Sequence, residues 1–134
     1  MLTFVAITQE DLPQLKSWID TDAWHQNKEE VDWWLRGYLS FKLVDERGTT
    51  VFVRFDREGD VVRLHSQFAI PSEVSEARVA SSIMDAIPRF IECAKVDGVK
   101  GIVTESISPK LVAFLQARLG FEYSGAGNDY VLKF

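Results

Sequence analysis

The sequence predicts one α/β (α+β) domain, in which about four helices pack on a mixed, mostly antiparallel sheet of about seven strands. The hydrophobic pattern changes several times between a helical repeat of about 3.6 residues and the two-residue repeat of strands. Turn-forming clusters separate neighbouring strand segments. The length of 134 residues and the hydrophobic content of 46% suit one core, so residues 1–134 are expected to form a single domain.

The first elements are expected to be a strand and two helices. Residues 3–7 are rich in β-branched and aromatic side chains, which favours a strand. Thr8 is followed by Asp11 three positions later, which is typical of the start of a helix. Asn27 is expected to cap a second helix that continues through residues 31–35.

From residue 38 the pattern alternates every two residues, which predicts an antiparallel meander of three strands. Its turns are expected at residues 45–48 and 56–60, where Asp, Glu, Arg and Gly cluster. The third strand is expected to span residues 61–70. Its even-numbered side chains form a largely apolar face, and its odd-numbered side chains, among them His65, form a mixed face.

A long helix is predicted over residues 72–95, where apolar residues recur at helical spacing. Pro88 lies inside it and predicts either a kink near residues 84–88 or two abutting helices. The strand that follows, residues 100–106, should run parallel to the strand before the helix, because a long helix is the usual crossover between parallel neighbours.

Ser108 and Pro109 are expected to begin the last helix, as cap and first helical residue, and Gly120 to end it. Residues 121–124 and 130–134 then read as a hairpin joined by a turn-rich loop. The predicted order of elements is therefore β-α-α-β-β-β-α-β-α-β-β.

Composition excludes several classes of function. Acidic residues outnumber basic ones 20 to 15, and the net charge of −5 argues against nucleic-acid binding. No window holds enough uninterrupted apolar residues for a membrane span, and the N-terminus lacks the features of a secretory signal, so a soluble, cytoplasmic protein is expected. The single cysteine, Cys93, and the two histidines, His25 and His65, predict no metal site.

This order of elements resembles the GNAT acetyltransferase superfamily over essentially the whole chain. The segment Phe114-Leu-Gln-Ala-Arg-Leu-Gly-Phe121 looks like the family signature in which a helix with an aromatic residue runs into Leu-Gly-Phe. The segment Ala69-Ile70-Pro71, before the long helix, looks like the strand-to-helix junction at which the family holds coenzyme A. In size and style the chain is also similar to short acetyltransferase-like proteins of tailed bacteriophages.

The resemblance implies acetyl-CoA as co-substrate, bound where two parallel strands diverge, with its pyrophosphate at a helix N-terminus. It implies that the free strand edge comes from Phe68, Ala69 and Ile70. The cradle for the phosphates would lie within residues 75–80. The cofactor-binding residues implied on helices are Ser75, Arg78, Ala80, Ser108 and Phe114.

The sequence departs from the family pattern at two places. The family's glycines are missing from the cradle, where only Ala80 matches, and Glu73 and Glu76 would repel phosphates unless they point away. Arg78 could compensate as a bidentate phosphate ligand. Gln116 stands where the family usually has a tyrosine that protonates the departing thiolate, and a carboxamide cannot supply that proton.

His65 is the first candidate for the general base, because its side chain points away from the apolar face and imidazole titrates near neutral pH. Glu105, at the end of the parallel partner strand, is the second candidate. The acceptor pocket is expected near the first two helices, with Trp24, His25 and Trp33 as substrate-binding residues. A surface or hydrogen-bonded position without a catalytic role is the alternative for His65, and ordinary packing against the sheet is the alternative for the tryptophans.

The sequence is compatible with three functions. The first is an acetyl-CoA-dependent N-acyltransferase that acts on an amine of a small molecule or a protein. The second is a binding protein that keeps the fold without the chemistry, such as a phage-type modulator of a host protein. The third is a structural subunit that forms a homodimer or a larger homo-oligomer.

Overall fold

The computed structural model describes residues 2–22 and 30–134, in which seven strands form one sheet of order β1-β2-β3-β4-β5-β7-β6. The strands are β1 (Thr3–Ala6), β2 (Leu39–Asp45), β3 (Gly48–Glu58), β4 (Val61–Gln67), β5 (Gly101–Glu105), β6 (Glu122–Tyr123) and β7 (Asp129–Lys133). The helices are η1 (Gln9–Asp11), α1 (Leu12–Asp20), η2 (Val31–Leu35), α2 (Glu76–Val96) and α3 (Pro109–Leu119), where η denotes a 3-10 helix. The predicted fold class is confirmed.

The second predicted helix is a five-residue 3-10 turn, η2, so the described residues contain three α-helices instead of four. The proposed cap, Asn27, lies outside the described residues. The chain leaves the helical conformation at Arg36 and then passes Arg54 of β3 closely at Gly37. A Cβ atom on Gly37 would lie 2.6 Å from Cγ of Arg54, which explains why this position holds a glycine.

The meander is confirmed, but its second turn is shorter than predicted. β3 continues through Asp56 to Glu58, because Asp56 pairs with Arg63 and Glu58 pairs with Val61 of β4. A two-residue turn at Gly59 and Asp60 then reverses the chain, and Gly59 has a φ of +68°. Asp56 therefore lies in the sheet and not in a turn.

The third meander strand and the long helix are both shorter than predicted where they meet. β4 ends at Gln67, and the backbone N–H groups of Glu73 and Val74 donate to the carbonyl of Ile70, which forms a turn. α2 then begins after Ser75, whose side chain caps it. α2 runs as one helix from Glu76 to Val96 with Pro88 inside, so the alternative of two abutting helices is wrong.

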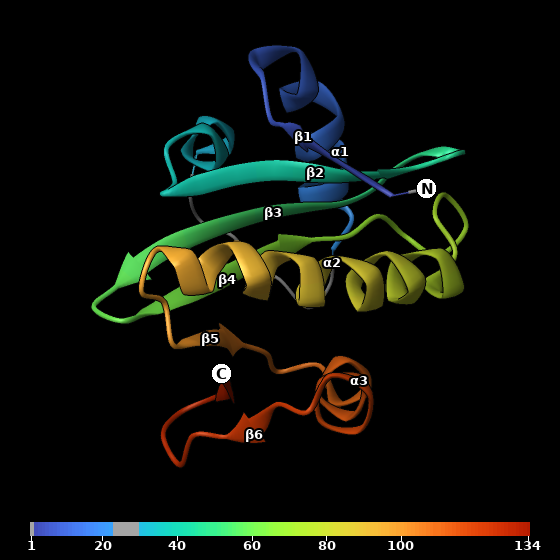
Figure 1. Ribbon diagram of the computed structural model, residues 1–134. Helices are drawn as coiled ribbons and strands as arrows, with labels where there is room; N and C mark the ends of the chain where they lie inside the picture. Colours follow the sequence, from blue (N-terminus) through green and yellow to red (C-terminus); the bar gives the residue numbers. More distant parts are fainter. Residues whose placement is uncertain (1, 23–29) are drawn as a thin grey trace.

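The sheet is covered on both faces, and Figure 1 shows α2 lying across its central strands. α2 and α3 pack on one face over a large core whose centre includes Phe55, Phe90 and Leu115. α1 and η2 pack on the other face over a smaller core that includes Trp18 and Trp34. β4 and β5 are parallel neighbours joined by α2, as predicted.

Candidate functional site

The parallel pairing of β4 and β5 stops partway along β4. It runs from Val61 and Gly101 to Leu64 and Thr104, where the Thr104 hydroxyl donates to the Leu64 carbonyl over 3.0 Å. Beyond this point β4 pairs only with β3, up to Gln67. The chain after β5 turns to the other side, because the N–H of Ser106 donates to the carbonyl of Asn128. The two strands therefore diverge, which is the feature expected from the resemblance.

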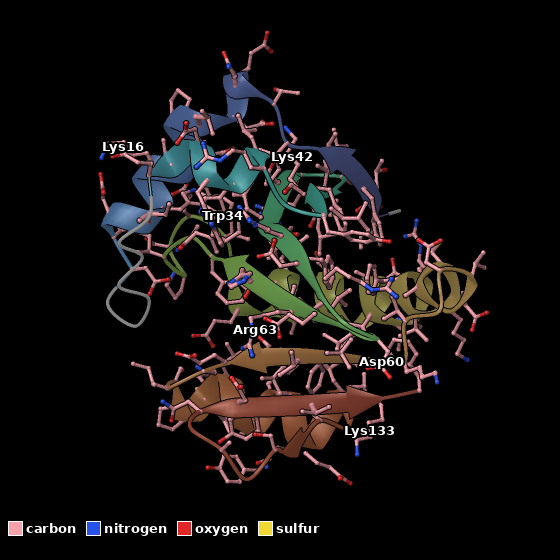
Figure 2. The ribbon with its side chains drawn as sticks, turned by 90° about the vertical axis from the view of Figure 1, so that its left-hand side faces the viewer. Lys16, Trp34, Lys42, Asp60, Arg63 and Lys133 are labelled. Atoms are coloured by element: carbon pink, nitrogen blue, oxygen red, sulfur yellow. The ribbon has the colours of Figure 1, made fainter. Side chains whose placement is uncertain are left out.

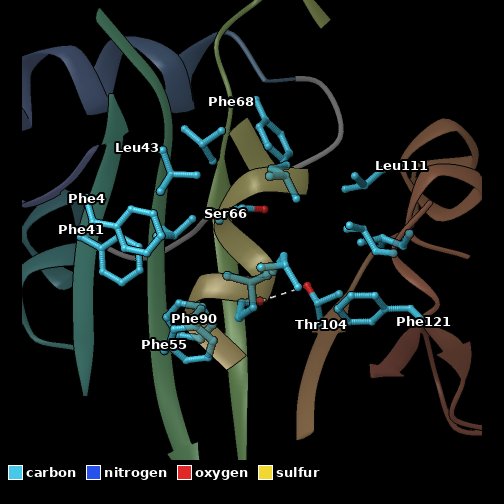
Figure 3. A pocket seen from close by; sticks show the side chains of 18 residues that line it. Phe4, Phe41, Leu43, Phe55, Ser66, Phe68, Phe90, Thr104, Leu111 and Phe121 are labelled. Carbon is cyan, nitrogen blue, oxygen red and sulfur yellow. Dashed lines mark hydrogen bonds between the residues drawn. The ribbon is translucent and has the colours of Figure 1, made fainter. Parts of the chain in front are cut away.

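An apolar pocket lies where the strands separate, between α2 on one side and α3 on the other (Figure 3). We call the part of the pocket next to the point of divergence the slot. Phe68 and Ser66 point into it from the β4 side, while Leu111 and Thr104 face them from the β5 and α3 side (Figure 3). The slot is defined by the residues Ser66, Phe68, Ile83, Thr104, Leu111 and Leu115.

The other predicted strand-edge and last-helix residues lie around the slot without lining it. Ala69 packs toward the smaller core, and Ile70 is exposed. Ser108 caps α3 by accepting from the N–H of Leu111 over 3.4 Å. Phe114 is half-buried outside the slot. Of these positions, Phe68 is the one that the structure places in the slot itself.

The N-terminus of α2 is arranged differently from the expected cradle. The guanidinium of Arg78 forms two hydrogen bonds, of 2.9 and 2.7 Å, with the carboxylate of Asp45 at the β2–β3 turn. These bonds are the main reason why the pKa of Asp45 falls to about 2. Arg78 thus joins α2 to the β2–β3 hairpin through the Nε and Nη2 edge of its guanidinium, and this edge is not available to a phosphate while the pair is formed. Ala80 is half-buried in the same helix.

Each of the two glutamates beside the cradle has a partner. Glu73 accepts a hydrogen bond of 2.9 Å from the indole of Trp18, which holds it on the α1 side. Glu76 forms an ion pair with Lys110 in the first turn of α3. Lys110 therefore brings a cation beside the N-terminus of α2. Sequence reasoning missed it, because 34 residues separate the two side chains.

The opposite side of β4 carries His65, as the alternation predicts. Its Nε2 lies 3.2 Å from Oδ2 of Asp56, and its ring makes an edge-to-face contact with Trp33, with ring centroids 4.9 Å apart. Arg54 lies over the same Trp33 ring, with Cζ 3.7 Å from the centroid. His65 is the first residue beyond the last β4–β5 pair, so the best base candidate is next to the point of divergence.

Arg63 of β4 extends this polar face across the sheet toward β5 and β7 (Figure 2). It donates to Glu58 over 2.9 Å and to both oxygens of Asp129, on β7, over 3.0 and 3.2 Å. The ion pair lowers the pKa of Asp129 and raises that of Arg63. Glu105 pairs in register with Asp129 and is exposed at the end of β5. The polar face consists of Arg54, Asp56, Glu58, Arg63, His65, Glu105 and Asp129.

The remaining predicted site residues lie away from the slot or outside the described residues. Trp24 and His25 lie outside the described residues, whereas Trp33 of η2 is half-buried on the polar face. Gln116 is exposed on α3 and does not line the slot. Within residues 2–22 and 30–134, no three His, Cys, Asp or Glu side chains gather in a way that could hold a metal ion. None of the described helices is long and apolar enough to cross a membrane.

No protein-family model and no curated protein matches the sequence. Solved structures do resemble this chain. The aminoglycoside acetyltransferase AAC(6')-Ib, solved with coenzyme A, superposes with a TM-score of 0.70 at 15% identity, over 99% of this chain and 95% of that chain. An N-acetyltransferase from Staphylococcus aureus gives 0.68 at 15% identity, over 99% and 98%.

A third structure is a GNAT family acetyltransferase from Brucella melitensis in complex with acetyl-CoA. It gives a TM-score of 0.64 at 15% identity, over 100% of this chain and 88% of that chain. These three matches cover at least 99% of this chain and at least 88% of the other chain, and they agree with the diverging parallel strands and the crossover helix described above. The chain therefore has the fold of the GNAT acetyltransferases.

Proposed function

We propose that this protein is an N-acyltransferase that transfers an acetyl group from acetyl-CoA to an amine of a small molecule or a protein. The observation that carries the proposal is the divergence of β4 and β5 after Leu64 and Thr104. This divergence opens the slot on one side and places His65 on the other. Fold alone does not determine function, so the proposal depends on these local features.

The residues of the slot suit a pantetheine arm. Phe68 and Leu111 provide apolar walls, and the part of β4 beyond Leu64 has no strand partner on the β5 side. The N-terminus of α2 attracts anions through its N–H groups, and Lys110 adds a positive charge beside it. When bound, acetyl-CoA supplies an activated acetyl thioester. The anion end of the site would rest on Lys110 and helix backbone, while Arg78 stays with Asp45.

On the polar face, His65 would take the proton that the amine loses as its nitrogen forms the new C–N bond and the thioester C–S bond breaks. Trp33 would form one wall of the acceptor pocket, with Trp24 and His25 proposed beside it. Glu105 would attract the cationic form of the amine and is the second candidate base. Gln116 is exposed, so we propose that the departing thiolate takes its proton from solvent and not from α3.

The decisive experiment is calorimetric titration with acetyl-CoA on the wild type and on Ser66→Trp. Ser66 points into the slot, so an indole there should block it and abolish binding. Ser81→Trp, at an exposed position of α2, is the matched control and should bind as the wild type does. Acetyl transfer is then measured with an amine panel of polyamines, aminoglycosides, and peptides with a free lysine or N-terminus. Absence of binding at millimolar acetyl-CoA would contradict the proposal.

A second candidate is a binding protein that has lost the chemistry, such as a modulator of a host protein in the cytoplasm. The Arg78–Asp45 ion pair and the exposed Gln116 favour it, because the anion site then lacks a free arginine and the helix lacks a proton donor. It predicts that Asp45→Asn, which releases Arg78, gains acetyl-CoA binding that the wild type does not have. Sedimentation of the free protein tests the proposed homodimer separately.

A further inference from the structure

Within residues 2–22 and 30–134, the carboxylate that lies within ion-pair distance of His65 is that of Asp56, on the neighbouring strand β3. Oδ2 of Asp56 lies 3.2 Å from Nε2 of His65. The side chains of Asp56 and His65 are 29% and 26% exposed, so the pair is partly shielded from water while substrate can still reach it. An ion pair in such surroundings is stronger than one in bulk water.

Asp56 is itself held in place by Arg54, two residues earlier on the same face of β3. Nε and Nη2 of Arg54 donate to the Asp56 carboxylate over distances of 2.9 to 3.1 Å. Arg54 is only 8% exposed, and its Nη1 donates to the backbone carbonyl of Trp33. The carboxylate therefore has few orientations open to it, because its partner is fixed at both ends.

Trp33 completes the arrangement by contacting both Arg54 and His65. Its ring lies under the guanidinium, with 3.7 Å between Cζ and the ring centroid, and the plane of the imidazole is at 84° to it. Indole faces favour cations, so this ring supports the charge of Arg54 and shields the ion pair beneath η2. These contacts fix three side chains relative to one another.

The other charged groups described on this side of β4 have partners of their own, and Asp22, which follows α1, accepts a hydrogen bond of 2.8 Å from the side chain of Gln67. On β4, Arg63 is balanced by Glu58 and Asp129, and on β3 Arg54 is balanced by Asp56. Glu105, on β5, is exposed at the end of its strand. Asp56 is thus the carboxylate that approaches His65 within ion-pair distance among the described residues.

We infer that Asp56 is a positioning residue, which orients the His65 imidazole and stabilises its protonated form when His65 takes a proton from the acceptor amine. Arg54 would act on His65 indirectly, by orienting Asp56. This inference rests on the proposed function for its catalytic meaning. The electrostatic coupling between the two side chains can be measured without any turnover.

The test compares Asp56→Asn with Glu58→Gln. Glu58 lies two residues further along the same face of β3, contacts Arg63 and not His65, and its substitution removes the same charge. NMR titration of His65 in the free protein is the first readout. The imidazole should titrate at lower pH in Asp56→Asn than in the wild type, because a neighbouring anion favours the protonated ring. Glu58→Gln should leave the titration where it is in the wild type.

The second readout is the pH profile of acetyl transfer. In Asp56→Asn the limb of kcat/KM that reports the base should move to lower pH, and kcat on the plateau should fall by about tenfold or more with little change in KM for acetyl-CoA. Asp56→Glu should recover part of the rate. If Asp56→Asn does not fold, Asp56→Glu and the wild-type titration in high salt, which weakens the coupling, provide the same comparison.

The outcomes separate the two hypotheses. A wild type that transfers acetyl groups, with an unshifted His65 titration in both variants, would overturn the inference and leave the proposed function standing. A shifted titration in a protein that transfers no acetyl group would retain the Asp56–His65 coupling but remove its catalytic meaning. A titration that moves equally in Asp56→Asn and Glu58→Gln would show only the effect of net charge and would also overturn it.

Discussion

The two faces of the sheet at β4 carry different kinds of side chain. The face toward α2 and α3 is apolar and belongs to the large core, where Phe55 and Phe90 stack with ring centroids 4.0 Å apart. The polar face consists of side chains tied to one another by ion pairs across three strands. The apolar face stabilises the fold and contains the slot, while the polar face holds charged groups at fixed positions. The apolar face can maintain the fold without the charges of the polar face. Substitutions on the two faces should therefore change the free energy of unfolding by different amounts.

Phe90→Ala should have the largest effect of all the changes considered. Phe90 is 6% exposed and stacks on Phe55, so its loss removes apolar burial and leaves a cavity between α2 and β3. The free energy of unfolding should fall by about 3–5 kcal/mol, measured by urea denaturation. Met84→Ala, at an exposed position of the same helix, should cost far less. Equal losses in the two variants would contradict the placement of the core.

Arg54→Ala should have the next largest effect, and it tests the polar face. The substitution leaves Asp56 without its main partner and removes the cation from the Trp33 ring. The expected loss is about 2–3 kcal/mol, less than for a fully buried pair because Asp56 keeps contact with water. Arg36→Ala removes an exposed ion pair with Asp32 and should cost less than about 1 kcal/mol. A loss as small as that of Arg36→Ala would mean that the polar face is not held rigidly.

This difference also explains how much could be predicted from the sequence. Periodicity identified the apolar side of β4 and the stripe of α2, since each depends on neighbours within a few residues. The parallel pair followed from the length of the crossover helix. The short η2 was not foreseen, because the sequence pattern carries no information on tertiary contacts such as the close passage of Gly37 beside Arg54, 17 positions later in the printed sequence.

The candidate site was only partly predictable for the same reason. His65 and Phe68 lie where strand alternation places them, on opposite sides of the diverging strand. Asp56 was expected in a turn, because Asp, Glu and Gly favour turns, but cross-strand pairing with Arg63 keeps it in β3. The partners of Arg78 and Glu76 are 33 and 34 residues away in sequence, and a pattern confined to one helix carries no information about them.

Asp45→Asn tests a charge that belongs to the α2 side of the sheet. Arg78 lowers the pKa of Asp45 from 3.8 to about 2 by hydrogen bonding, so the ionised form is stabilised in the folded protein. Its contribution is present above the unfolded pKa and is lost as pH falls from about 4 to about 2. We expect a loss of about 1 kcal/mol in Asp45→Asn at pH 7, discounted for solvent screening, that disappears near pH 2.

The measurement for Asp45→Asn is denaturation at several pH values, with Phe90→Ala run in parallel. The deficit of Phe90→Ala should be the same at every pH, since no titrating group is involved. A deficit of Asp45→Asn that stays constant down to pH 2 would indicate that the carboxylate acts through packing and not through its charge.

The smallest expected effect on stability is that of Glu76→Gln, and it addresses the anion end of the slot. The ion pair of Glu76 with Lys110 is exposed, with side chains 57% and 79% accessible, so its removal should change the free energy of unfolding by less than about 1 kcal/mol. Affinity for acetyl-CoA should nevertheless rise about two- to fivefold at low ionic strength, because a negative charge leaves the N-terminus of α2 and Lys110 becomes available. Lys110→Gln should weaken binding, and both differences should shrink in high salt. If neither substitution changes the calorimetric affinity for acetyl-CoA at low salt, the phosphates do not bind at the N-termini of α2 and α3, and the anion end of the site lies elsewhere.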